Sequence, residues 1–367
     1  VAIDDKILTV TAPFWRTDIE TREDIVEEVG RLHGFDKLPL ELPERSIKPV
    51  QKDILFELKA HIRENLVKCG ANELLTYSFV HGNLLDKVGQ DKSQAFQLSN
   101  ALSPDLQYYR LSLTPSLLDK VHPNIKAGYE QFALFEIGKT HHAARSSEEG
   151  LPIEEDVVAL VIAASNKLSL KGAAFYEAKA YIDKLAATLG VELEYLPVSE
   201  SLDDEAYKPF VANRSALVRS KALDKIVGIV GEYTKSTQKN LKLPDHSAGF
   251  EVLLEGLMTT GKTHRYEVLS RFPQVTQDIT FKFAADTAQA ALLEAARDSL
   301  RVIQPEQTRA TLDTLGIYQS ENETSSKNVT FRLTIASFEK TLRDSEVAAL
   351  LDQVATKVHE ALGAERV

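Results

Sequence analysis

The chain has 367 residues, 43% of them apolar, with 43 Lys+Arg against 54 Asp+Glu and a single cysteine, Cys69. One thiol excludes a disulfide scaffold and a cysteine-based zinc site, and neither a membrane span nor a signal sequence is visible. The net charge of −11 argues against a strongly basic nucleic-acid binder. We therefore expect a soluble protein of a reducing cytoplasm, with about two or three domains.

The chain begins inside a predicted β-hairpin. Residues 7–11 alternate apolar and polar side chains, and Asp4, Asp5 and Lys6 before them are typical of a turn. The first residue is Val1 and not a methionine. Because it stands so close to a structured element, we expect this chain to be a fragment of a longer polypeptide whose own start lies upstream.

Two amphipathic helices follow the hairpin. The first is predicted to begin near Thr21 and to end at Gly34, and the second ends at Gly70. Residues 38–45 between them contain two prolines and predict an extended linker. The apolar faces consist of Ile25, Val29 and Leu32 in the first helix and of Ile54, Leu58, Ile62 and Leu66 in the second.

The middle of the chain, residues 70–262, alternates strand-like runs with helices and predicts a mixed α+β domain. A helix over residues 175–189 is ended by Gly190. Strands are predicted over residues 74–80, 134–138, 157–162 and 226–230.

From residue 266 the pattern predicts the order β-α-β-β-α-β, the ferredoxin-like arrangement. Both helices would cover one face of an antiparallel sheet and leave the other face open. The predicted features are an inward alternation at Ile279, Phe281 and Phe283, a helix capped by Asp286 and carrying Ala288, strands over 310–318 and 329–336 joined by a polar turn over 321–327, a helix capped by Asp344 and ended by Gly363, and a closing strand over 365–367.

The densest group of possible metal ligands lies near the first helix: Asp18, Asp24, Glu27 and Glu28. Hard carboxylate oxygens so close in sequence could hold Mg²⁺. The alternative is that they decorate a helix start, where the macrodipole favours negative charge.

No other motif predicts an assembled active site. His141 and His142 are adjacent and lack metal-site spacing, so we expect a partly exposed structural role for both. Gly228 and Gly231 lack the remaining residues of a phosphate loop and more simply ease a strand or turn. Cys69 sits near a helix end, where a packed thiol is expected. We therefore predict no catalytic residues and no bound organic cofactor.

The open face of the last domain is a candidate binding surface. Residues 268–367 contain 11 Lys/Arg against 14 Asp/Glu, so any RNA contact would be small and positional. The stacking aromatics of an RNA-recognition module are not predicted there, and a solvated face is the alternative. Alternation places on this face Asp278, Thr280, Lys282, Arg309, Asp313, Thr330, Arg332 and Thr334, of which Lys282, Arg309 and Arg332 are the candidate RNA contacts.

Three separated stretches together resemble the β subunit of bacterial phenylalanyl-tRNA synthetase. The first is PFWRTDI at residues 13–19 with DIVEEVGRLHGFD at 24–36. The second is NALSP at 100–104, YRLSLTPSLL at 109–118 and LFEIGK at 134–139. The third is SRFP at 270–273, with Asp278, FRL at 331–333 and TL at 341–342.

The resemblance implies three parts: the C-terminal part of a winged-helix-like B5 module over 1–45, a non-catalytic class II synthetase-like core over 46–264, and a ferredoxin-fold anticodon-binding domain over 265–367. It implies that Asp18, Asp24, Glu27 and Glu28 bind a Mg²⁺ shared with the α subunit. It also implies an α2β2 heterotetramer in the cytoplasm that attaches phenylalanine to tRNA(Phe), with ATP used through the α subunit. The isolated chain would then be inactive, and without an editing module it would not hydrolyse misacylated tRNA.

Two other functions stay open at this point. One is a stand-alone RNA-binding or regulatory paralogue of that subunit. The other is an independent Mg²⁺-dependent hydrolase that uses the acidic group, in which Asp24→Asn would abolish turnover.

Overall fold

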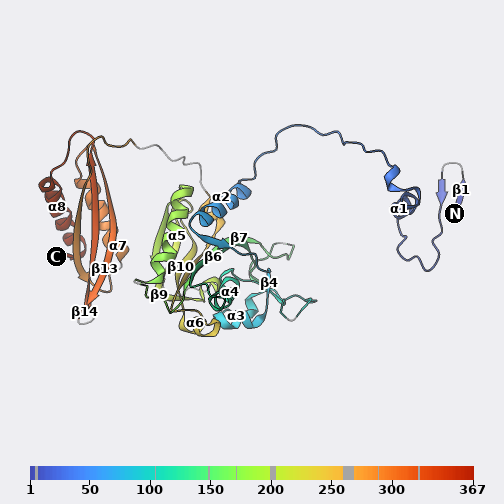
Figure 1. Ribbon diagram of the computed structural model, residues 1–367, viewed down its shortest axis with the longest axis horizontal. Helices are drawn as coiled ribbons and strands as arrows, with labels where there is room; N and C mark the ends of the chain where they lie inside the picture. The colour runs from blue at the N-terminus through green and yellow to red at the C-terminus, as the bar shows by residue number, and fades with distance from the viewer. Residues whose placement is uncertain are drawn as a thin grey trace. The chain divides into compact units, whose positions relative to one another are not determined.

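The computed structural model describes residues 1–4, 7–103, 105–147, 149–170, 172–198, 204–258, 268–287, 289–320 and 323–367 (Figure 1). The chain divides into two units, Val1–Lys52 and Asp53–Val367, and each is described by itself. Within these ranges, no helix combines the length and the apolar character needed to cross a membrane.

The first unit holds a short hairpin and one helix. Strand β1 (Ala2–Asp4) pairs antiparallel with β2 (Ile7–Thr9), and the turn predicted at Asp5 and Lys6 lies outside the described residues. Helix α1 (Arg22–His33) begins after Thr21 and ends at Gly34, as predicted, and the 3-10 helix η1 (Phe35–Lys37) follows it.

Most apolar side chains of α1 remain exposed. Val26, Val29 and Leu32 face solvent, Ile25 is half-buried, and none of the described residues of this unit is fully buried. Most helical stability in proteins comes from packing an apolar face, so α1 lacks that contribution here. Residues 39–53 are exposed and form neither helix nor strand, which agrees with the predicted extended linker.

A seven-stranded sheet forms the body of the middle region. Its neighbours pair antiparallel, except that β3 runs parallel to β6. In spatial order the strands are β3 (Ala71–Glu73), β6 (Gln131–Thr140), β7 (Glu155–Ala164), β11 (His246–Leu253), β10 (Lys225–Tyr233), β9 (Phe210–Ser220) and β8 (Leu193–Pro197).

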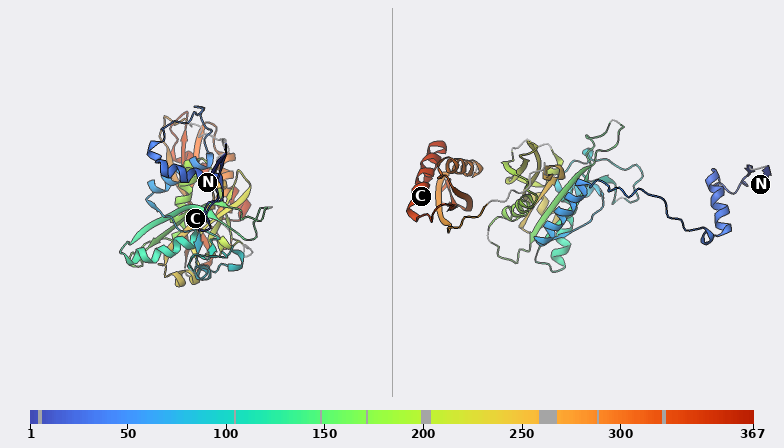
Figure 2. Two further views of the ribbon diagram at one scale, coloured as in Figure 1. Left: turned by 90° about the vertical axis from the view of Figure 1, so that its right-hand side faces the viewer. Right: turned by 90° about the horizontal axis from the view of Figure 1, so that it is seen from above.

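Helices cover both faces of this sheet (Figure 2). Helices α2 (Ile54–Lys68) and α5 (Ala174–Leu189) pack on one face, and α3 (Gly82–Val88), α4 (Thr114–Lys126) and α6 (Lys235–Leu241) pack on the other. Strand β7 lies in the interior of the sheet, and its residues 157–164 are all buried. This explains why its sequence is continuously apolar instead of alternating.

The strand predicted over 74–80 is wrong for most of its length. Only Phe79–Val80 is extended and paired, as β4 against β5 (Tyr108–Tyr109). The amide of Thr76 instead donates to the carboxylate of Glu136 at 3.3 Å, and its hydroxyl donates at 2.7 Å. A tertiary hydrogen bond thus replaces a strand partner. Three short 3-10 helices complete the region, η2 (Lys92–Gln94), η3 (Glu205–Tyr207) and η4 (Leu254–Leu257).

The C-terminal region has the predicted ferredoxin-like topology. Its four strands are antiparallel in the order β13-β14-β12-β15, and α7 and α8 pack together on one face. The elements in chain order are β12 (Val275–Ala284), α7 (Gln289–Ile303), β13 (Thr308–Ser320), β14 (Glu323–Ser337), α8 (Asp344–Leu362) and β15 (Glu365–Arg366).

Two details of this region correct the prediction. Strand β14 already begins at Glu323, so residues 323–327 belong to the strand and not to a polar turn. Asp344 is the first residue of α8 and not its cap, which is Arg343. The amide of Arg343 donates to Glu346 at 2.9 Å. The capping hydrogen bond is thus made by the residue before the predicted cap. The predicted position of Ala288 lies outside the described residues.

Candidate functional site

The acidic group near α1 is organised by an arginine. The guanidinium of Arg16 donates to Asp18 and to Glu28, in each case at 2.7 Å, and Glu28 also accepts from Arg31 at 2.9 Å. The hydrogen bond from Arg16 lowers the pKa of Asp18 to about 2. Those from Arg31 and then Arg16 lower the pKa of Glu28 to about 2. Both carboxylates are therefore held ionised at one cation.

The other two predicted ligands stand apart from this pair. Asp24 accepts the amides of Glu20 and Thr21 at 2.8 and 2.7 Å, which is the role of an acidic residue in a first helical turn. Glu27 is exposed on α1. Across the described ranges, no three His, Cys, Asp or Glu side chains lie close enough together to hold a metal ion.

The strand register places the predicted polar residues of the last domain on one sheet face. Arg332 lies between Asp278 on β12 and Asp313 on β13. It donates to both carboxylate oxygens of Asp278, at 2.8 and 2.9 Å, and this lowers the pKa of Asp278. The charge of Arg332 is thus already balanced on the sheet.

The same face also carries an aromatic ring, contrary to the prediction. Thr314 pairs with Phe331 but Gly316 pairs with Thr330, so Leu315 is an extra residue in β13. This β-bulge reverses the alternation, and Tyr318 comes to lie on the open face, 66% exposed. The signal in the sequence is Gly316, because a glycine inside a strand often marks a bulge.

A hollow of about 390 Å³ opens on this face. It lies beside Arg309 on β13 and Thr334 on β14. Elsewhere on the same face, the hydroxyls of Thr280 and Thr330 lie 2.9 Å apart. Its lining residues are Leu269, Ser270, Phe272, Gln274, Arg309, Thr311, Thr334, Ala336 and Phe338.

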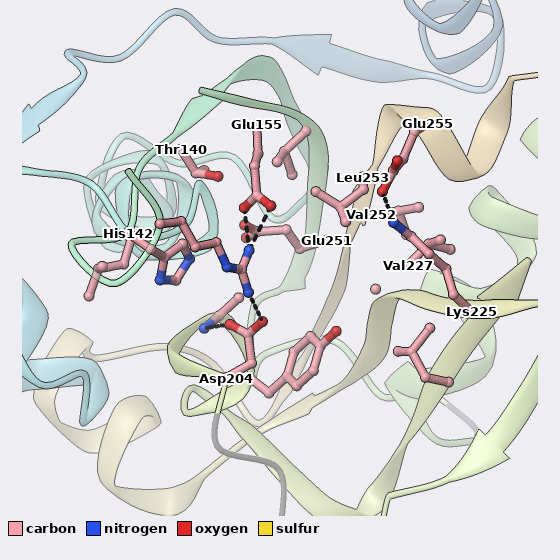
Figure 3. Close-up of a pocket in the computed structure, with 17 residues that line it drawn as sticks. Thr140, His142, Glu155, Asp204, Lys225, Val227, Glu251, Val252, Leu253 and Glu255 are labelled. Carbon is pink, nitrogen blue, oxygen red and sulfur yellow. Dashed lines mark hydrogen bonds and ion pairs between the residues drawn. The ribbon is translucent and has the colours of Figure 1, made fainter. Parts of the chain in front are cut away.

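A second cavity lies in the middle region, between the sheet and the loops that cover it (Figure 3). The guanidinium of Arg145 donates to both oxygens of Glu155, at 2.6 and 2.7 Å, and lies 3.4 Å from Asp204. Lys225 pairs with Glu255. No sequence motif indicated this site, because its residues come from several separate segments between Leu111 and Glu255.

Glu251 is the most perturbed acid of this cavity. It is buried and accepts hydrogen bonds from the amides of Leu113 and Thr114, at 3.1 and 2.9 Å, and from the Thr114 hydroxyl at 2.6 Å. These donors form the start of α4 and favour the anion. Burial outweighs them and raises the pKa of Glu251 to about 7.

Another buried carboxylate is fully paired. The side chains of Arg110 and Glu136 are 4% and 3% exposed and meet at 2.7 Å. Arg110 also donates to the carbonyl of Lys139 at 2.9 Å. A Cβ atom on Gly138 would lie 2.3 Å from the Arg110 guanidinium. Only a glycine at position 138 therefore leaves room for the Arg110 side chain in this ion pair.

The remaining candidates are structural, with one correction. His141 and His142 are both buried, not partly exposed, and burial lowers the pKa of each ring. His141 packs against Tyr109, with ring centroids 4.5 Å apart. Cys69 follows the last turn of α2 with intermediate exposure. Gly228 and Gly231 lie in β10, where a Cβ atom would collide with a neighbouring strand, so they ease strand packing as expected.

Sequence models of three families match the chain in order. The tRNA synthetase B5 domain matches residues 1–35, the phenylalanyl tRNA synthetase beta chain CLM domain matches residues 38–254, and the ferredoxin-fold anticodon binding domain matches residues 270–366.

Curated relatives align over nearly the whole chain. The phenylalanine–tRNA ligase beta subunit of Geobacillus kaustophilus is 28% identical over 370 residues, which cover 98% of this chain and 44% of that protein. The subunit of Syntrophus aciditrophicus is 25% identical, covering 97% and 44%. The chain thus spans about half the length of these relatives. A solved pyrrolysyl tRNA synthetase of Desulfitobacterium hafniense has 18% identity and a TM-score of 0.42, covering 55% of this chain and 65% of that one.

Proposed function

The chain belongs to the phenylalanyl-tRNA synthetase beta chain family, and on this premise we propose that it supports the ATP-dependent attachment of phenylalanine to tRNA(Phe) without catalysing it. It would pack on an α subunit in a cytoplasmic α2β2 heterotetramer, and its last domain would hold the tRNA anticodon. The reaction on the α subunit would then be faster, because this chain holds the bound tRNA in position. The observation that carries the proposal is the match of three family models in chain order.

We propose a separate role for each of three domains, which span residues 1–45, 46–264 and 265–367. The first would be the C-terminal part of a B5 module and the second a non-catalytic core. In that core the buried ion pair of Arg110 and Glu136 and the capping role of Glu251 account for two carboxylates that could otherwise serve as acids or bases. We therefore assign catalysis to the α subunit, and the isolated chain is expected to show no turnover.

The proposed RNA surface is the open face of the last domain. Single-stranded bases stack on exposed aromatic rings, and the bulge in β13 presents Tyr318 for this purpose. Lys282 and Arg309 would contact phosphate or base edges beside it. Arg332 would act as a positioned hydrogen-bond donor more than as a free charge, because Asp278 balances it.

Removing the ring of Tyr318 tests this surface. Tyr318→Ala is expected to weaken tRNA(Phe) binding about 5- to 150-fold, because stacking of one base contributes about 1–3 kcal/mol. The measurement is a filter-binding titration of the full 367-residue chain at fixed, low salt concentration.

Tyr129→Ala is the matched control, since Tyr129 is 62% exposed but lies in the middle region. Its affinity for tRNA(Phe) should equal that of the parent chain. Equal losses in both variants, or no loss in Tyr318→Ala, would contradict the proposed surface.

The acidic group near α1 would hold Mg²⁺ in contact with the α subunit. Carboxylate oxygens are the ligands this ion prefers, and Asp18 and Glu28 already converge on one cation, the guanidinium of Arg16. Asp24 and Glu27 stand apart from this pair in the chain alone and would join it on assembly with the α subunit. The ion would supply a structural bridge between the chains.

A Mg²⁺ titration of the chain assembled with its α subunit tests these ligands. The double variant Asp18→Asn, Glu28→Gln is expected to lose one bound Mg²⁺ per chain in calorimetry, because two of four carboxylates lose their charge. Glu20→Gln, in the same loop, serves as the control and should retain it. An unchanged number of bound ions in the double variant would rule out this site.

A further inference from the structure

The cavity of the middle region has the size of a small-molecule site. Its volume is about 340 Å³, at the lower end of the range for ligand pockets. Part of its lining is apolar, with Leu111, Val157 and Leu253 among others, and the rest is polar or charged. An occupant would therefore combine an apolar body with a polar group.

The charges of the rim do not balance. Arg145 alone serves two carboxylates, Glu155 and Asp204, and it lies closer to the first. Glu251 has no basic partner within the described part of the chain, but its pKa of about 7 leaves it only partly ionised near neutral pH, so the surplus charge comes first from Asp204. Lys225 is paired with Glu255. The cavity thus carries surplus negative charge and would attract a cation and repel an anion.

Neutral acceptors that make no hydrogen bond line the same cavity. The ring of His142 is 9% exposed, points into the group of labelled side chains in Figure 3, and makes no hydrogen bond to any described residue. The hydroxyls of Thr140 and Tyr207 likewise make none to the described residues. Thr140 and His142 are buried and Tyr207 is half-buried, so a ligand with several donors would find three unused acceptors here.

We propose that this cavity binds a small amphipathic amine, a molecule with a cationic nitrogen on an apolar body. An ammonium group carries three hydrogen-bond donors and no acceptor, which suits the unused acceptors and the surplus negative charge. The apolar body would lie against the apolar part of the lining, which includes Leu111, Val157 and Leu253. This site is separate from the proposed RNA surface and from the proposed Mg²⁺ ligands.

Calorimetric titration of the 367-residue chain tests the site with 3-methylbutylamine as the probe. We expect a dissociation constant of about 1 mM or tighter. The alcohol of the same shape, 3-methylbutan-1-ol, and the anion pyrophosphate should bind at least about tenfold more weakly. Equal binding of the alcohol, or preferred binding of pyrophosphate or Mg²⁺, would overturn the proposal.

Two substitutions locate the bound amine. Asp204→Asn should weaken binding of the amine about tenfold, because it removes one rim charge and keeps an oxygen to accept the amide of Ala206. The matched control is Asp224→Asn, since Asp224 shares Arg219 with Glu194 as Asp204 shares Arg145 with Glu155. Asp224 does not line the cavity, although Lys225 beside it does.

His142→Gln provides an independent test if Asp204→Asn perturbs folding. It should also weaken binding of the amine, whereas Asp224→Asn should leave it unchanged. Amine binding that survives both cavity substitutions, or that falls equally in the control, would refute the site.

Discussion

Replacing Glu136 with alanine is expected to lower the free energy of unfolding of the middle region by about 3–5 kcal/mol. The substitution leaves the guanidinium of Arg110 buried without its counter-charge, and Thr76 also loses the acceptor of its hydroxyl and amide. The cost is therefore that of an unpaired buried charge, which exceeds the net contribution of the ion pair itself.

Hydrogen exchange of the β7 amides at increasing urea concentration measures this effect, because it reports on the sheet of the middle region alone. Glu194→Ala is the matched control, since Glu194 pairs with Arg219 on the same sheet but near the surface. Exposed pairs contribute about 0–1 kcal/mol. Similar losses in the two variants would show that burial does not set the cost.

The stability of the middle region is expected to fall by about 3 kcal/mol as pH rises from 4.5 to above 7, through Glu251 alone. Burial raises the pKa of this carboxyl from 4.5 to about 7. The folded chain therefore binds the proton more tightly than the unfolded chain does. The stabilising contribution is fully present below the unfolded pKa and is lost as pH rises through the folded pKa.

Urea unfolding of the parent chain and of Glu251→Gln at several pH values isolates the contribution of Glu251 to stability. All other titrating groups are common to the two proteins, so the difference between their free energies of unfolding reports on Glu251. We expect the parent to lose about 3 kcal/mol relative to the variant across this pH range. A difference that stays constant with pH would mean that the donors of Leu113 and Thr114 offset burial and leave the pKa of Glu251 the same in the folded and unfolded chains.

The sequence predicted those elements whose pattern is local. The helix start at Thr21, the helix end at Gly190 and the alternation of Ile279, Phe281 and Phe283 each depend on nearby residues. The strand predicted over 74–80 was wrong because Glu136, sixty positions away, takes the hydrogen bonds of Thr76. The pattern of residues around Thr76 carries no information about a hydrogen-bond partner sixty positions away.

Of the candidate sites, the sequence predicted the residues of the open face but not its chemistry. Arg332 lies where alternation placed it, yet its neutralisation by Asp278 follows only from the strand register. The cavity around Arg145 and Glu251 could not be predicted at all, because it exists only once β7, β11 and η3 come together. The ligand assignments for Mg²⁺ and RNA remain predictions.

The bulge at Leu315 decides which residues of β13 reach the open face. Loss of Leu315 would remove the bulge but leave Tyr318 opposite Asn328 on that face, because Gly316 would still pair with Thr330. If Leu315 instead entered the ladder, Tyr318 would turn toward the helices and Ile317 would reach the open face. An aligned gap at this position between two relatives would therefore leave the face unchanged, whereas a register shift of one residue would exchange a tyrosine for an isoleucine on it.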